Sequence, residues 1–283
     1  MQKLIVNADD FGLCSSVNKA IIDCHLAGNI NSTTLMVNMP GSIEAVELAK
    51  QHPKLGIGLH FCITEGLALT GTSSITNDKG EFYDWGNLNK RILKGKVKKR
   101  DIEEELKAQF DFLKNANISA THADSHQHIH MNNMVFSVFK SFFQDSNLPI
   151  RLVDPPQINF KLFLERPKKG IKQILLKILS NWHRKGLKNN TNDILVSIHD
   201  IIEHTNTTTK SYEKILNKLQ KGSIVELMVH PYINGTDLKN FYVNEWNKKK
   251  PFFELCFDEH NILNKKNFIQ NISGLLPIRY DEI

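Results

Sequence analysis

The feature that most constrains the fold of this 283-residue chain is an alternation of short apolar runs, rich in β-branched residues, with longer segments of helical period. Such an alternation is typical of βα units around a parallel sheet. The strand candidates are residues 3–7, 32–37, 55–60, 121–125, 149–153, 194–198 and 224–229. About seven βα units without an internal linker predict one α/β domain over residues 1–283, folded as a distorted (β/α) barrel similar to a TIM barrel.

Helices are expected between the strands, over residues 15–27, 42–51, 101–115 and 132–143. Ser15 or Ser16 is suited to cap the first helix, because a hydroxyl oxygen can accept a hydrogen bond from a free amide of the first turn. Gly28-Asn29 is suited to end that helix.

A long segment from Cys62 to about Asn87 is rich in Gly, Thr and Ser. It is too long for a routine connection, which favours a functional loop over a site. Phe82, Tyr83 and Trp85 lie near its end, and these aromatic side chains suit either stacking on a sugar ring or anchoring of the loop to the core.

A basic helical insertion is predicted around residues 156–192. Between Lys161 and Lys188 many Lys and Arg residues are opposed only by Glu165, and Ile171–Leu179 has amphipathic spacing. Three interpretations stay open: a solvated helix packed on the barrel, a lid or oligomer contact, and a helix lying on a membrane surface.

The composition excludes several classes of protein. The net charge is +6, but no basic motif with interleaved aromatic residues accompanies it, so no nucleic acid partner is expected. No run of about twenty apolar residues and no signal peptide are present, so we expect a cytoplasmic protein without stable membrane insertion. The four cysteines are scattered, which argues against a zinc ribbon or a disulfide framework. A homodimer is an arrangement that the sequence leaves open.

Ionisable residues recur where the predicted strands end, the edge at which (β/α) barrels carry their chemistry. Asp9-Asp10 follows the first strand, His60 ends the third, and His199 and His230 close two later strands. A catalytic metal needs about three protein ligands and an open position, and one Asp with two His residues would satisfy this need. Taken singly, such an Asp pair is more often a helix cap or a solvated turn, and a lone histidine such as His60 is more often a hydrogen-bonded structural residue.

The cluster His122-Ala-Asp-Ser-His-Gln-His-Ile-His130 is harder to explain structurally. Its polar residues, at positions 122, 124, 126, 128 and 130, recur at period two. An extended segment would project all of them to one face. We therefore expect this segment to supply metal ligands.

Several motifs stand out along the chain. They are Leu4-Ile-Val-Asn-Ala-Asp-Asp-Phe-Gly-Leu13, Asn18, Ser32-Thr-Thr, Met36-Val-Asn38, Gly58-Leu-His60, Thr121-His-Ala-Asp-Ser-His-Gln-His-Ile-His130 and Glu226-Leu-Met-Val-His-Pro231. Together these motifs resemble the YdjC family of carbohydrate deacetylases. The resemblance covers the first 150 residues almost continuously and returns around His230. It is weaker over about residues 155–210, where the basic insertion lies.

The resemblance implies a metal-dependent hydrolase that removes the N-acetyl group from N-acetylglucosamine units of short oligosaccharides or related acetylated sugars. It also implies one divalent metal ion, Mg2+ or Zn2+. Carried over by motif, the roles are Asp9 as general base, Asp10, His60 and His126 as metal ligands, His230 as general acid or transition-state stabiliser, and His128 and Arg151 as residues that line the substrate pocket.

Two other functions stay open at this point. His126-Gln-His128 is also a His-x-His pair of the kind used in multinuclear sites, which would suit a metal-dependent phosphoesterase. A sugar-binding protein without turnover is the non-enzymatic alternative. Asp9 argues against it, because a pure binder does not need a free base beside a metal site.

Overall fold

A parallel sheet forms the centre of the computed structural model, which describes residues 2–156, 167–201, 207–216 and 223–283. Its strands are β1 (Lys3–Phe11), β2 (Ser32–Leu35), β3 (Gly56–Phe61), β4 (Ala123–Ser125), β5 (Ile194–Ser197), β6 (Ile224–Val229) and β7 (Pro277–Ile278). The strand order is β4-β3-β2-β1-β6-β5, and β7 also pairs with β1. Most strand residues are buried, as expected for parallel strands covered on both faces.

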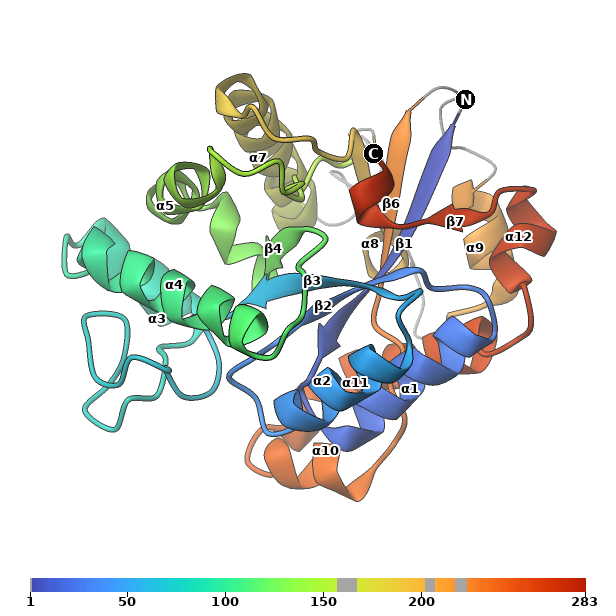
Figure 1. Ribbon diagram of the computed structural model, residues 1–283, viewed down its shortest axis with the longest axis horizontal. Coiled ribbons are helices and arrows are strands. Elements are labelled where there is room, and N and C mark those ends of the chain that lie inside the picture. Colours follow the sequence, from blue (N-terminus) through green and yellow to red (C-terminus); the bar gives the residue numbers. More distant parts are fainter. Residues whose placement is uncertain (1, 157–166, 202–206, 217–222) are drawn as a thin grey trace.

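Residues 149–154, the closing segment, connect the two edge strands of this sheet. The amide of Ala123 in β4 donates to Pro149 O (2.9 Å), and the amide of Leu195 in β5 donates to Asp154 O (2.8 Å). The side chain of Asn192 bonds to both the amide and the carbonyl of Leu152, as a neighbouring strand would. The sheet thus curls back on itself, and the predicted distorted (β/α) barrel is confirmed (Figure 1).

The strand predicted over residues 149–153 is wrong in detail, because this part of the closing segment makes only an isolated bridge between Ala123 and Ile150. Proline explains the irregularity. Pro149 and the Pro155-Pro156 pair lack an amide hydrogen, so they interrupt a regular ladder at both ends.

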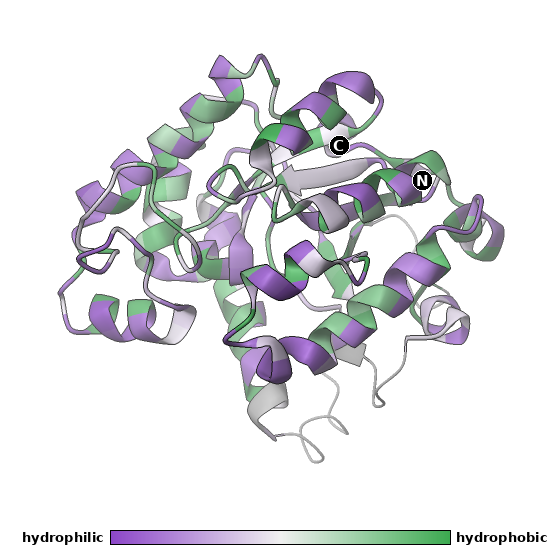
Figure 2. Cartoon of the chain, turned by 90° about the horizontal axis from the view of Figure 1, so that it is seen from below, coloured by the Kyte–Doolittle hydropathy of each residue, from purple (hydrophilic) through white to green (hydrophobic). Residues whose placement is uncertain are grey.

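Helices cover the barrel. They are α1 (Ser15–Leu26), α2 (Ser42–Gln51), α3 (Trp85–Leu93), α4 (Lys99–Asn115), α5 (Asn133–Phe143), α7 (Pro167–Gly186), α8 (Ile198–Ile201), α9 (Thr209–Leu216), α10 (Thr236–Phe241), α11 (Trp246–Leu263) and α12 (Phe268–Ser273), together with the 3-10 turns η1 (His126–Met131) and η2 (Tyr280–Glu282). In Figure 1, α1, α2, α10 and α11 lie together at the bottom, with α4, α5 and α7 toward the left and top. Figure 2 shows green and purple mixed along most helices, as expected for amphipathic elements.

Two local predictions about helices are corrected. The N-cap of α1 is Cys14, whose side chain makes no capping hydrogen bond, so neither Ser15 nor Ser16 has the expected role. Instead, the Asp237 carboxylate accepts a hydrogen bond from the Ser16 amide (2.8 Å). Helix α3 begins inside the expected loop, because the Asp84 carboxylate accepts a hydrogen bond from the Asn87 amide (3.0 Å) and starts a helix there. The connection over the site therefore ends at residue 84.

The described part of the basic insertion is helix α7; residues 157–166 lie outside the described residues. Leu176 and Leu179 pack against the small core cluster around Leu152, and the ring of His183 stacks on Phe136 (3.6 Å between centroids). The outer face of α7 exposes Ile171, Leu175, Ile178 and Trp182. Within the described ranges, no helix combines the length and the apolar character needed to cross a bilayer.

Candidate metal centre

The two consecutive aspartates lie in the last residues of β1 rather than after it. Asp10 has a left-handed backbone (φ 69°), and the pairing of β1 with β2 is irregular between Ala8 and Phe11. Such a conformation is uncommon for a residue other than glycine and is often found at functional sites. At this irregular backbone, the carboxylates of Asp9 and Asp10 contact different partners.

Asp10, His60 and His126 converge at this end of the barrel. The Asp10 Oδ1 atom lies 3.3 Å from His60 Nε2 and 3.0 Å from His126 Nδ1. One potential ligand atom from each residue lies within 4.8 Å of the other two. One carboxylate and two imidazoles match the number and the type of donors that a catalytic divalent cation requires, so the cluster is compatible with a metal site.

Further side chains orient the two imidazoles from outside this cluster. His60 Nδ1 lies 2.6 Å from Asp124 Oδ1 and 3.0 Å from Thr34 Oγ1. His126 Nε2 lies 3.0 Å from Glu65 Oε2. Each ring thus directs one nitrogen to Asp10 and the other to a carboxylate, which is the usual arrangement around histidine ligands of metals.

The same carboxylates set the protonation of the two rings. Burial alone would lower the pKa of His60, but Asp124 and Asp10 raise it to about 10. Burial also acts to lower the pKa of His126, whereas Asp10 and Glu65 raise it to about 9.

Asp10 and Glu65 are themselves held by residues of the last third of the chain. The hydroxyl of Tyr232 donates to Asp10 Oδ2 (2.5 Å), and Lys249 on α11 donates to Glu65 Oε1 (2.8 Å). The lysine also lies 3.9 Å above the centre of the Tyr242 ring. These contacts connect the loop after β3 with α11 across the site.

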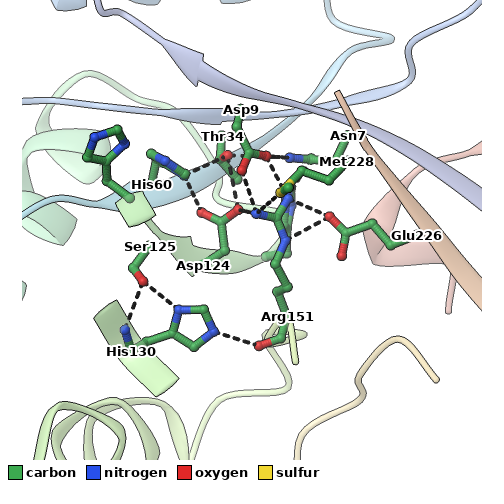
Figure 3. Close-up of polar contacts among 12 residues, drawn as sticks. Asn7, Asp9, Thr34, His60, Asp124, Ser125, His130, Arg151, Glu226 and Met228 are labelled. Atoms are coloured by element: carbon green, nitrogen blue, oxygen red, sulfur yellow. Dashed lines mark hydrogen bonds and ion pairs between the residues drawn. The ribbon is translucent and has the colours of Figure 1, made fainter. Parts of the chain in front are cut away.

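Asp9 contacts the buried side chain of Arg151 (Figure 3), and one of its oxygens also lies within 4.8 Å of a ring nitrogen of His60. The guanidinium contacts both oxygens of Asp9, each at 2.7 Å, and Asn7 Nδ2 donates to Asp9 Oδ1 (2.9 Å). Burial would raise the pKa of Asp9, but the charge and hydrogen bonds of Arg151 hold it well below its usual value. Asp9 is therefore an ionised carboxylate in a fixed orientation.

Arg151 contacts three carboxylates in all. Besides Asp9 it pairs with Asp124 (2.5 Å) and with Glu226, to which its Nε donates (2.7 Å). Burial is the main cause that raises the pKa of Glu226, to about 7, although Arg151 and the hydroxyl of Tyr280 act to lower it. Arg151, which was expected to line the substrate pocket, is fully buried and contacts Asp9.

The other two expected site residues are only partly buried. His128 lies in η1, and its Nδ1 atom is buried without a hydrogen-bond partner among the described residues. His230 follows β6, and its amide donates to Glu259 Oε2 (2.6 Å). Burial lowers the pKa of His230, although Asp10 and Asp9 act to raise it.

The extended segment expected over residues 122–130 is wrong. Gln127 and His128 have positive φ angles (53° and 56°), and the chain turns into η1 instead of continuing β4. His122 and His130, at the two ends of the cluster, consequently pack among structural residues. The ring of His122 stacks on Tyr280 (4.1 Å between centroids), and His130 Nε2 lies 3.1 Å from Arg151 O.

Several polar residues of the site were not singled out from the sequence, namely Glu65, Asp124, Glu226, Tyr232, Lys249 and Glu259. Asp124 carried a signal, because it lies between histidines of the cluster. Glu65 lies in the loop that was expected to cover a site, but its partner Lys249 is far away in sequence, so no local pattern joins them.

Fold and site together define a class of protein, an α/β barrel with a cluster of one aspartate and two histidines fit for a divalent metal. Residues 3–266 match the family model described as YdjC-like protein. The chain therefore belongs to the YdjC family.

Relatives in this family carry names that describe an activity. A chitooligosaccharide deacetylase of Yersinia enterocolitica is 33% identical over 235 residues, which is 82% of each chain. A carbohydrate deacetylase of Geobacillus stearothermophilus is 42% identical over 149 residues, 53% of this chain and 59% of that protein.

Among solved structures, a protein of Enterococcus faecalis V583 described as a cellobiose-phosphate cleavage protein superposes with a TM-score of 0.75. It covers 99% of this chain and 98% of its own, at 23% identity. At this identity the likeness shows the fold alone.

Proposed function

We propose that residues 1–283 act as one deacetylase domain, a metal-dependent hydrolase that removes the N-acetyl group from N-acetylglucosamine units of oligosaccharides or related acetylated sugars. The observation that carries the proposal is the convergence of Asp10, His60 and His126 beside Asp9, an ionised carboxylate outside that cluster. The names of the relatives, chitooligosaccharide deacetylase and carbohydrate deacetylase, support the class of substrate.

Asp10, His60 and His126 would hold one divalent cation. When bound, this cation would polarise the acetamide oxygen and make water a stronger acid. Two imidazoles favour Zn2+ or another transition metal over Mg2+, which prefers oxygen donors.

Asp9 would accept a proton from the attacking water as a general base. Because its pKa is low, Asp9 is ionised at neutral pH and able to accept a proton, although a carboxylate of low pKa is a weak base. Arg151 positions it, because both carboxylate oxygens are fixed by the guanidinium. A base held in one orientation needs no reorganisation during the reaction.

His230 would donate a proton to the departing sugar amine. Glu259 fixes the backbone at this position through the His230 amide. Since burial lowers the pKa of His230, its ring must take up a proton from solvent before it can donate one to the amine, and the negative charges of Asp10 and Asp9 favour this uptake.

His128 and Trp85 would contact the sugar. The buried Nδ1 atom of His128 has no hydrogen-bond partner among the described residues, so it offers a polar contact to a bound ligand. Of the three aromatic residues near the end of the loop, Phe82 is buried, whereas Trp85 is 48% exposed. Tyr83 is half-buried beneath the Arg91 guanidinium. Trp85, the most exposed of the three, would therefore stack on a pyranose ring, and Phe82 anchors the loop.

Acetate release tests the proposal. We would incubate the wild type and Asp9→Asn with N-acetylglucosamine, chitobiose and their 6-phosphates, with and without added Zn2+ or Mg2+. We expect metal-dependent acetate release that falls roughly 10² to 10⁴-fold in the variant, because the general base is lost. Asp111→Asn, an exposed aspartate on α4, is the matched control and should keep full activity.

Two outcomes would contradict the proposal. A folded, metal-loaded wild type that releases no acetate from any of these sugars would not be a deacetylase of this class. Release of phosphate from the 6-phosphates without acetate would instead indicate a phosphoesterase.

A further inference from the structure

A second group of potential metal ligands lies at the ends of β5 and β6. His199 is in α8, which directly follows β5, His230 follows β6, and Glu259 comes from α11. One potential ligand atom from each lies within 4.8 Å of the other two. None of the three belongs to the cluster of Asp10, His60 and His126, although His230 is the proposed proton donor.

We propose that His199, His230 and Glu259 form a second divalent-cation site, suited to a transition metal such as Zn2+, and that a cation bound there inhibits the enzyme by occupying His230. The inhibition rests on the proposed function, whereas the site itself does not. Two histidines and one glutamate are a ligand set that zinc uses in hydrolases. A hard cation such as Mg2+ would favour oxygen donors over this set.

The carboxylate of Glu259 is already arranged as a metal ligand would be. It is fully buried, which is costly for a charge unless several groups stabilise it. The Tyr212 hydroxyl donates to its Oε1 (3.0 Å), and the His230 amide donates to its Oε2 (2.6 Å). Donors of this kind fix carboxylate ligands in metal sites.

The two imidazoles stand close to this carboxylate. His199 Nε2 lies 3.1 Å from Glu259 Oε2, and the rings of His199 and His230 lie 5.4 Å apart and nearly perpendicular (88°). His230 Nδ1 is buried and has no hydrogen-bond partner among the described residues, which a bound cation would supply.

Only a small adjustment would bring the donors onto one ion. Donor atoms bound to zinc at about 2.1 Å lie roughly 3.4 Å from one another in a tetrahedral site. The separations here, all within 4.8 Å, require the rings to move by about an ångström. The side chain of His199 is 13% exposed, so the group is not sealed from an incoming ion.

Occupation of this site would have a chemical consequence. Metal binding uses the lone pair of an imidazole nitrogen and releases any proton it carried to solvent. A ring of His230 that binds a cation through Nδ1 could not become the doubly protonated imidazolium, which is the acid that would give a proton to the sugar amine from the other nitrogen. Zinc beyond the first equivalent should therefore inhibit, whereas excess Mg2+ should not.

Equilibrium dialysis against Zn2+, followed by metal analysis, tests the site. We expect two zinc ions per chain for the wild type and one for His199→Gln, whose amide can still donate to Glu259 but is not an imidazole ligand. His52→Gln, a change of a histidine outside both clusters, should keep two. His126→Gln should keep one, because it disrupts only the first cluster. One zinc per wild-type chain at saturation, or two in folded His199→Gln, would overturn the proposal.

Acetate release tests the consequence for His230. Excess Zn2+ should slow the wild type by roughly 10²-fold, the contribution of a general acid, and should leave His199→Gln unaffected. Full wild-type activity with two zinc ions bound would refute the inhibitory role. If no sugar yields acetate, the proposed function fails, yet the zinc count still decides whether the second site exists.

Discussion

Asp9 and Asp10 are neighbours in sequence but contact different side chains directly. The left-handed backbone at Asp10 accompanies an arrangement in which Asp10 contacts His60 and His126, while Asp9 contacts Arg151. In a regular strand adjacent side chains point to opposite faces, so the sequence could indicate that the pair divides its roles. It could not indicate which carboxylate would meet an arginine 142 residues away.

Asp124 offers a test of how the histidine ligands are oriented. In Asp124→Asn the carboxylate that lies 2.6 Å from His60 Nδ1 is replaced by a neutral amide. We expect the affinity for Zn2+ at the first site to fall roughly 10 to 100-fold, as is usual when such an outer partner is lost. Competition with a coloured chelator would measure it.

The control for this change is Asp111→Asn, on the exposed face of α4. Its affinity for zinc should equal that of the wild type. An unchanged affinity in Asp124→Asn as well would mean that His60 keeps its orientation without this carboxylate.

At the scale of elements, the sequence predicted the strands better than the connections. β3 and β6 lie within one residue of the expected bounds, because apolar runs of this length are distinctive. η1 was missed because its left-handed residues, Gln127 and His128, are not types that demand such a backbone. The three proposed ligands were assigned through the family resemblance, and two of them lie in motifs at the ends of predicted strands. Glu259 carried no such signal, because its place depends on how α11 packs.

Gly58 on β3 provides a prediction at this scale. A Cβ atom at this position would lie 2.5 Å from the ring of His122, which is packed against Tyr280. We therefore expect Gly58→Ala to lower the free energy of unfolding by about 1–3 kcal/mol through overpacking. Urea denaturation would measure the change.

Gly86→Ala in the first turn of α3 is the matched control. Its added Cβ meets only the Asp84 carboxylate, at 3.3 Å, and alanine favours a helix over glycine. No loss of stability is expected there. Equal destabilisation by both changes would show that the contact with His122 is not the cause.

For the whole molecule, the notable electrostatic feature is one buried arginine among three carboxylates. Glu226 has a pKa of about 7 in the folded protein, above its ordinary 4.5, with burial as the main cause. Between these values the folded state holds a proton that the unfolded state loses. Its contribution to stability is therefore complete below about pH 4.5 and disappears as the pH rises through about 7.

Glu226→Gln removes this titration while it keeps an oxygen for Arg151 Nε. Relative to the wild type, the variant should gain up to about 3 kcal/mol as the pH rises from about 5 to 8. Urea denaturation at intervals over this range would measure the difference. A difference that does not change with pH would mean that Glu226 titrates normally.

The closing segment joins the barrel without the regular ladder of hydrogen bonds that a strand forms, and it also carries Arg151, which holds Asp9. Local opening of a protein begins where such bonds are sparse. Each opening of this segment would loosen the guanidinium from the carboxylate and leave the proposed base without its orientation. Amide exchange at Ile150 and Leu152 would consequently report, on a timescale of seconds to hours, how often the protein visits a state that is folded but inactive.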